Sequence, residues 1–454
     1  MKRFTWAIVI ICLLCAALFV IYGLEIKPVE NLIRPPEYSD EGGSVQLALE
    51  AEIGKMYFLK TPTQGENRSA YIYHDFDKDG GKEAIVLYSE LKNPDSVTMS
   101  LFRQNGESWE RITSVSCPYA EVIQVDFADI NGNGTDDIVV GYSIYGAEIT
   151  QHLFVYSINS LEAENPSVSV RYDCSYSKYT VVDVDRDDRC DLLVLNSDAD
   201  GNLGYKAQVI FFSQTDCEVK ASVLLDSALR IVSDISFDCP DFSGTRIYID
   251  GYTADGKMLT DMIVWNKKKS IFERAEYRNK SIASITTRTK ASLCCDINSD
   301  SITDMPTDYL LPASKALGSG STKSISLLNY VSAYGDRLIS VGCYFENADN
   351  GYYYKINKSF IGKFTIVTSL DATSAKFYSV KQDDDGTSVA DKLLFEIRTV
   401  TDLETGRAPQ TFKSIGQNKE FYYYCRIYGE GERSGYTISS IRKNMIYDLK
   451  GNVK

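Results

Sequence analysis

Residues 75–83 read DFDKDGGKE and are followed at residues 84–88 by the apolar run AIVLY. Side chains that carry oxygen stand at positions one, three, five and nine of this loop, and a glycine stands at position six. The same pattern begins again at residues 129, 183 and 296. The first two intervals are both 54 residues long, and the third, 113 residues, is about twice as long. The chain is therefore interpreted as built around a repeat.

The spacing of these oxygens suits a hard cation. Ca²⁺ takes six to eight oxygen ligands, and side chains at alternate positions of a tightly curled loop can converge on one point. Position six must turn sharply, which favours glycine and tolerates Asn or Asp. Gly80 and Gly134 fit this position, Asp188 is acceptable, and Ser301 is a departure. The loop is not an EF-hand, because strand-like runs flank it and its last acid stands at position nine instead of twelve.

This arrangement resembles the calcium-binding loops of FG-GAP (VCBS-type) repeats, which form the blades of integrin α-subunit β-propellers. The resemblance covers roughly residues 70–347. It implies that each loop joins the first two strands of a four-stranded blade and that its side chains hold one Ca²⁺. The second site has two carboxylates among its four side chains and is expected to bind most weakly; four acidic turns without metal are the alternative. The ligands implied by the resemblance are Asp75, Asp77, Asp79 and Glu83; Asp129, Asn131, Asn133 and Asp137; Asp183, Asp185, Asp187 and Asp191; and Asp296, Asn298, Asp300 and Asp304.

Strand-like runs occur in sets of four, separated by Gly, Asn, Asp or Pro, as expected for a mainly β propeller fold. The fourth set begins near Asp238, where Pro240 and Phe242 replace the alternating oxygens, so this blade is expected to bind no metal. A fifth set spans about residues 291–347. Five blades are countable, and five to seven are possible. The runs of the first three sets lie at residues 70–74, 84–89, 97–103 and 109–116; 121–127, 138–144, 151–157 and 167–173; and 179–184, 192–196, 205–213 and 218–225.

The N-terminus is predicted to be a membrane anchor. Lys2 and Arg3 precede an apolar run from Phe4 to Leu24, which as a helix of about 1.5 Å per residue would be about 31 Å long, enough to cross a bilayer. The positive charges before the run place the bulk of the chain outside the cytoplasm, in a single-pass arrangement at the cell membrane. A secreted or lipid-anchored chain is the alternative.

The remaining segments complete a four-part organisation. A transmembrane signal anchor occupies residues 1–24, a linker with a short helix residues 25–54, and the propeller residues 55–354. From residue 355 the loop period stops, strand-like runs continue, and residues 437–449 have the apolar periodicity of a helix that Thr437 can cap. Residues 355–454 are therefore predicted to form a small α+β domain.

The composition excludes several classes of function. The formal net charge of −14 argues against a nucleic-acid partner and against an anionic lipid surface. Only two histidines are present, His74 and His152, and the sequence has no glycine-rich phosphate loop and no G-x-S-x-G motif. We therefore predict a membrane-anchored, extracytoplasmic calcium-binding propeller that is not an enzyme and binds a protein or a glycan. The alternative is a calcium-dependent polysaccharide lyase or hydrolase on the same scaffold.

Overall fold

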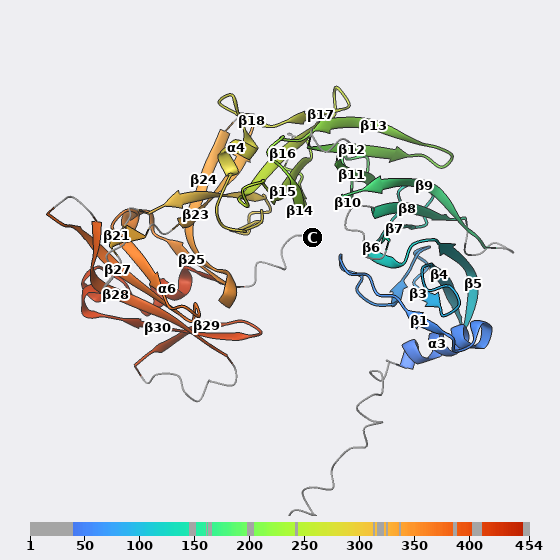
Figure 1. Ribbon diagram of the computed structural model, residues 1–454, viewed down its shortest axis with the longest axis horizontal. Helices are drawn as coiled ribbons and strands as arrows, with labels where there is room; N and C mark the ends of the chain where they lie inside the picture. Colours follow the sequence, from blue (N-terminus) through green and yellow to red (C-terminus); the bar gives the residue numbers. More distant parts are fainter. Residues whose placement is uncertain are drawn as a thin grey trace, which may run out of the picture. The chain divides into compact units, whose positions relative to one another are not determined.

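The computed structural model is mainly β (Figure 1). It divides into two compact units. Unit 1 is Met1–Val122 with Asn159–Val168, and unit 2 is Ile123–Ile158 with Ser169–Lys454. The structure describes residues 40–447 except 145–150, 160, 162–165, 198–203, 241–243, 312–313, 316–321, 324–325, 336, 385–387 and 402–410.

Unit 1 is an antiparallel sheet with a helix packed against it. The order is β1-β3-β4-β5, and β2 also pairs with β3, further along the edge that β1 occupies. Strand β3 is buried along almost its whole length, so it reads as a continuous apolar run. The elements are α3 (Asp40–Ile53), β1 (Tyr57–Leu59), β2 (Tyr71–His74), β3 (Glu83–Glu90), β4 (Val97–Asn105) and β5 (Ser108–Cys117).

Helix α3 covers this sheet through two apolar side chains. Val45 and Leu49 are fully buried in one cluster with Val86 and Tyr88 of β3. The helix ends at Ile53, and the next residue, Gly54, has a positive φ of 75° that terminates the helical backbone.

Unit 2 contains three four-stranded antiparallel sheets in chain order, each a simple meander (Figure 1). They correspond to the second, third and fourth sets of strand-like runs, and their form is that of propeller blades. The strands are β6 (Glu121–Ala128), β7 (Asp137–Ser143), β8 (Gln151–Ile158) and β9 (Val168–Tyr176); β10 (Lys178–Val182), β11 (Asp191–Ser197), β12 (Tyr205–Phe212) and β13 (Cys217–Leu224); and β14 (Ile231–Asp238), β15 (Arg246–Tyr252), β16 (Met258–Asn266) and β17 (Ile271–Arg274).

Successive sheets of unit 2 share apolar cores. Val139 of β7 lies in one cluster with Val194 of β11, and Leu193 of β11 lies in another with Ile249 of β15. The inner strand β11 therefore buries both of its faces, one against each neighbouring sheet. Such packing explains why β7, β11 and β15 are buried along most of their length and the outer strands β9 and β13 are not.

The fifth sheet of unit 2 has the order β20-β23-β24-β25-β31, and the last sheet contains β21, β22 and β26–β30. Strand β31 comes from the C-terminal part of the sequence and pairs with β25. The elements are β18 (Glu276–Tyr277), β19 (Lys280–Ser281), α4 (Ile282–Thr286), β20 (Asp304–Leu310), β21 (Ser314–Lys315), β22 (Thr322–Lys323), β23 (Ser326–Tyr334), β24 (Arg337–Asn347), η1 (Ala348–Asn350), β25 (Tyr352–Ile356), η2 (Lys358–Phe360), β26 (Phe364–Thr368), β27 (Ser374–Gln382), β28 (Ser388–Thr401), β29 (Lys413–Gln417), β30 (Phe421–Ile427), α5 (Gly429–Arg433), α6 (Ile438–Lys443) and β31 (Met445–Tyr447).

The predicted helix at residues 437–449 is shorter than expected. Thr437 caps α6 in a capping box with Ser440, as predicted, but the helix ends at Lys443. Met445 and Ile446 instead pair with β25, because their backbone groups complete the edge of the fifth sheet. Pairing with a distant strand has overridden the local helical pattern.

The predicted membrane location is corrected by the structure. Among the described residues, no helix combines the length and the apolar character needed to cross a bilayer. Helix α3, with 14 residues, spans about 21 Å and carries several acids, whereas a bilayer core needs about 30 Å. The apolar run at residues 1–24 lies outside the described residues. The single-pass anchor, and the export inferred from it, are not retained.

Candidate metal centres

The four acidic loops have the same backbone conformation. They are named loop 1 (residues 75–83), loop 2 (129–137), loop 3 (183–191) and loop 4 (296–304). Position six is left-handed in every loop, with φ from +65° to +93°, and Ser301 adopts this conformation although it is not a glycine. Position four is also left-handed, with φ from +59° to +72°, which the sequence pattern did not indicate. The residues at position four are Lys78, Gly132, Arg186 and Ser299.

Three backbone hydrogen bonds recur in all four loops. The amide of position six donates to the carboxylate of position one at 2.7–3.0 Å. The amide of position two donates to the carboxylate of position nine at 3.0–3.2 Å. The amide of position seven donates to the side-chain oxygen of position five at 2.6–3.0 Å. The loop therefore curls around its own acidic side chains, whichever residues occupy the other positions.

Loops 1 and 3 bring carboxylates together but do not supply a hydrogen-bond donor for every buried carboxylate oxygen. One oxygen each from Asp75, Asp77 and Glu83 lie within 4.8 Å of one another in loop 1. In the described part of the chain, the only other such cluster is in loop 3, from Asp183, Asp185 and Asp191. Within these clusters, Oδ1 of Asp75 and Oδ1 of Asp185 are buried and have no hydrogen-bond partner. An unsatisfied buried acceptor costs about 1–3 kcal/mol, and more when it is charged.

The clustered carboxylates of loop 3 are hard to ionise. Burial, followed by the backbone hydrogen bond from Val184 and the neighbouring acids, determines the pKa of Asp191, which is raised to about 8. Burial also raises the pKa of Asp185. In loop 1 burial is likewise the main cause that raises the pKa of Asp77 and of Glu83. A hard divalent cation prefers oxygen ligands, which are the only ligands these loops offer. It would also reduce the repulsion between the carboxylates and pair with the unsatisfied buried oxygen. The residues of both loops therefore fit Ca²⁺.

Loop 2 satisfies its buried acid with an amide. Nδ2 of Asn131, at position three, donates to Oδ1 of Asp137 at 2.9 Å and to Oγ of Ser157 at 2.9 Å. The pKa of Asp137 is raised by burial to about 6, a smaller rise than that of Asp191. Hydrogen bonds from Ser157 and from two backbone amides favour the ionised form and limit the rise.

Loop 4 satisfies its buried acid, Asp304, with a hydroxyl, and its asparagine amide donates to an exposed acid. Nδ2 of Asn298, also at position three, donates to Oδ2 of Asp300 at 2.9 Å. Oγ of Ser332 on β23 donates to Oδ1 of Asp304 in a short hydrogen bond. Burial raises the pKa of Asp304 to about 6 as well. Loops 2 and 4 therefore need a cation less than loops 1 and 3 do.

In the fourth sheet, the protein itself supplies a cation. Arg246 is the first residue of β15, the position at which β3, β7, β11 and β20 carry the last acid of their loops. Its Nε and Nη2 donate to the two carboxylate oxygens of Asp238, each at 2.6 Å, and both side chains are buried. Asp238 also accepts from the amide of Thr303 at 2.8 Å, and Arg246 donates to the carbonyl of Ala333. A fixed guanidinium thus gives a physical reason for the expectation that this sheet binds no metal.

The partners on the third strand were missed from the sequence, although a signal was present. Ser157 stands 20 residues after Asp137, and Arg103 stands 20 residues after Glu83. In the sheets of loops 1 and 2, a residue at this offset lies on the next strand, directly opposite position nine of the loop. Superposing the repeats on each other would have identified these positions.

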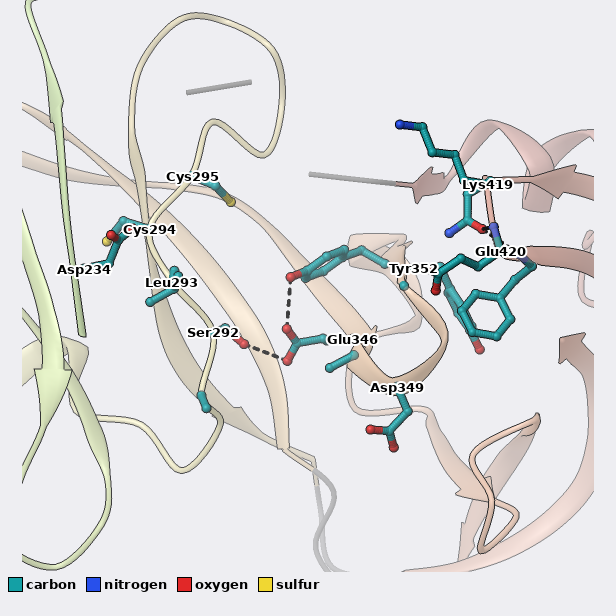
Figure 2. A pocket seen from close by; sticks show the side chains of 16 residues that line it. Asp234, Ser292, Leu293, Cys294, Cys295, Glu346, Asp349, Tyr352, Lys419 and Glu420 are labelled. Atoms are coloured by element: carbon teal, nitrogen blue, oxygen red, sulfur yellow. Dashed lines mark hydrogen bonds between the residues drawn. The ribbon is translucent and has the colours of Figure 1, made fainter. Parts of the chain in front are cut away.

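A large hollow in unit 2 is lined by residues outside the four loops, although Cys294 and Cys295 of its lining directly precede loop 4. It has a volume of about 840 Å³ and is lined by segments that include Asp234, Glu346 and Glu420. Glu346 accepts hydrogen bonds from Ser292 at 2.6 Å and Tyr353 at 3.0 Å. Figure 2 shows Asp234 and Glu420 on opposite sides of Glu346, so these three acids do not converge on one point.

Comparison with known proteins identifies one segment of the chain. Residues 75–140, from loop 1 into β7, match the family model described as FG-GAP-like repeat. A search of the curated proteins found no match. Among solved structures, a protein from Lactobacillus plantarum is similar with 10% identity and a TM-score of 0.32, over 74% of this chain and 95% of that one. That likeness is too distant to define the fold.

Proposed function

We propose that this FG-GAP-repeat chain is a calcium-stabilised β-propeller module that binds a protein or a glycan. The observation that carries the proposal is the pair of buried, unpartnered carboxylate oxygens, Oδ1 of Asp75 and Oδ1 of Asp185, each inside a cluster of acids. A folded chain that places such oxygens among like charges needs a counter-charge. Loop 1 and loop 3 would receive it from Ca²⁺.

The proposed ligands follow the loop pattern. In loop 1 they are Asp75, Asp77, Asp79 and Glu83, and in loop 3 they are Asp183, Asp185, Asp187 and Asp191. We propose weaker sites at loop 2 (Asp129, Asn131, Asn133 and Asp137) and at loop 4 (Asp296, Asn298, Asp300 and Asp304), because an amide already satisfies the buried acid of loop 2 and a hydroxyl that of loop 4. Bound Ca²⁺ would neutralise the acids and hold the end of one strand to the start of the next.

The proposed binding role is based on the net charge of the chain and on the arrangement of its acidic side chains. The formal net charge of −14 makes a nucleic-acid partner unfavourable, so the proposed ligand is a protein or a glycan. We favour a non-enzymatic role over a polysaccharide lyase or hydrolase. Such an enzyme needs acid and base groups that converge on a substrate, whereas Asp234 and Glu420 lie on opposite sides of Glu346 in the hollow of about 840 Å³ (Figure 2).

Thermal unfolding with and without calcium tests the proposal. We expect added Ca²⁺ to raise the unfolding midpoint relative to EDTA, since one site at a hundred times its dissociation constant stabilises the fold by about 2.7 kcal/mol. Mg²⁺ at equal concentration should have a smaller effect, because it demands near-ideal octahedral geometry. The double variant Asp77→Asn with Asp185→Asn should lose most of the calcium response. Identical midpoints in Ca²⁺ and EDTA would contradict the proposal.

A further inference from the structure

Loop 1 differs from its three counterparts in the residue that faces position nine from the third strand. In loop 2 and loop 4 this residue is a serine, Ser157 or Ser332, and its hydroxyl forms a hydrogen bond inside the loop. In loop 3 the register places Phe211 there, and in the fourth sheet Val264. In loop 1 the pairing of Ala84 with Phe102 places Arg103 next to Glu83. A cationic side chain at this position therefore occurs beside loop 1 and beside none of the other described loops.

Arg103 is not used by the protein to neutralise its neighbours. Among the described residues it forms no ion pair, although Glu83 lies beside it on one strand and Glu110 is its register partner on the other. Its Nη2 is buried and has no hydrogen-bond partner. Arg246 shows the contrast, because its guanidinium is fully engaged by Asp238 and Ala333. Guanidinium groups are suited to bidentate recognition of a carboxylate, and Arg103 lacks one.

A hollow connects Arg103 to the proposed calcium loop. It lies in unit 1, has a volume of about 510 Å³, and is lined by Asp77, Asp79 and Glu83 together with Lys82, Arg103 and Gln104. In the absence of a metal, the three acids would repel an anion. With a divalent cation in the loop, the same hollow would present that cation, Lys82 and Arg103 to an incoming group.

We infer that loop 1 and Arg103 form a binding site for an acidic side chain of a partner protein, in which Arg103 recognises the carboxylate. The inference rests on the proposed calcium site in loop 1. One carboxylate oxygen would accept from the Arg103 guanidinium, and the other would face the cation. A protein partner is favoured over a uronic acid glycan because no aromatic side chain, on which a sugar ring would stack, lines the hollow.

A peptide titration tests the site. The probe is a fluorescein-labelled peptide with four glutamates and an amidated C-terminus, and its all-glutamine twin is the control ligand. In Ca²⁺ we expect the acidic peptide to bind at least about tenfold more tightly to the native chain than to Arg103→Gln, because a charge-assisted hydrogen bond is lost. Arg68→Gln, which changes an exposed arginine of the same unit, should bind as the native chain does. Arg103→Lys keeps the charge and should retain part of the affinity.

Calcium calorimetry separates failure of the inference from failure of the proposed function. If the native chain binds no Ca²⁺, both ideas fail. If the native chain binds Ca²⁺ but Asp77→Asn binds as many ions as tightly, loop 1 holds no metal and only the inference fails. If Ca²⁺ binds loop 1, binds Arg103→Gln equally, and the peptide does not distinguish Arg103→Gln from the native chain, only the inference fails. Binding of oligogalacturonate in place of the peptide, with loss in Arg103→Gln, would overturn the protein partner in favour of a glycan. Peptide binding that persists in EDTA would also overturn the inference.

Discussion

Loops 1 and 3 have the same backbone as loops 2 and 4 but a different chemistry at position three. Asp77 and Asp185 stand where the other two loops have Asn131 and Asn298. The asparagine amide donates a hydrogen bond to an acid of its own loop, whereas the aspartate adds a further negative charge. The comparison teaches that the loop backbone is the same with either side chain at position three. The proposed difference in calcium binding therefore rests on that side chain and on its neighbour on the third strand.

In the fourth sheet, the positive charge beside the buried acid is the guanidinium of Arg246. We expect Arg246→Met to destabilise the protein by about 3–5 kcal/mol, because Asp238 would remain buried without its partner. The loss should be equal in Ca²⁺ and in EDTA, as measured by urea unfolding. The double variant Arg246→Met with Asp238→Leu should recover most of the stability. A loss that calcium reverses would show that a metal can replace the guanidinium.

Converting loop 2 into the type of loop 1 should make it depend on metal. In EDTA we expect Asn131→Asp to lower the free energy of unfolding by about 1–3 kcal/mol, because Asp137 loses its amide donor and gains a like charge. Saturating Ca²⁺ should restore the stability, and calorimetry should detect a stronger site than in the native chain. Asn131→Ala, which removes the donor without adding an acid, serves as the control and should show no restoration.

The reverse change in loop 3 should separate stability from calcium binding. We expect Asp185→Asn to raise the free energy of unfolding in EDTA by about 0.5–1.5 kcal/mol, since the new amide can donate to Asp191 as Asn131 does to Asp137. Calcium binding at loop 3 should weaken at the same time. A variant that is less stable than the native chain in EDTA would show that the asparagine of loop 2 is not transferable.

The pKa of Asp191 predicts how the stability of the metal-free protein changes with pH. Burial raises the pKa of Asp191 from 3.8 to about 8, so the folded state holds this proton more tightly than the unfolded chain does. In EDTA, the contribution of Asp191 to stability should therefore be complete below about pH 4 and fall as the pH rises toward 8. Asp191→Asn should flatten this part of the profile. Urea unfolding of both proteins from pH 4 to pH 9 provides the measurement, and a slope that Asp191→Asn leaves unchanged would assign it to other groups.

Much of the fold could be predicted from the sequence because the decisive signals are local. A nine-residue pattern followed by an apolar run specifies a hairpin corner and an inner strand, and β3, β7 and β11 begin at its last residue. The same pattern led to the acids that the structure brings together in loops 1 and 3, whereas the predicted ligands Asp79 and Asp187 are in neither cluster. Whether those acids hold Ca²⁺ stays a prediction.

The misses concern partners that lie far apart in the sequence. Ser332 meets Asp304 from another strand, and Arg246 takes its role only because β14 places Asp238 opposite it. The pairing of β31 with β25 depends on an edge that no local pattern reveals. The apolar run at residues 1–24 led to the wrong location because its length and composition alone do not place it in a membrane.

The pairing of Met445–Tyr447 with Tyr352–Tyr354 has a consequence during biosynthesis. When β25 leaves the ribosome, strands β26–β30 must still be synthesised before β31 emerges. Until then the outer edge of β25 stays open to other nascent chains or to a chaperone. A nonsense codon shortly before residue 445 would leave that edge open permanently and would produce an aggregating protein, although every acidic loop would be intact.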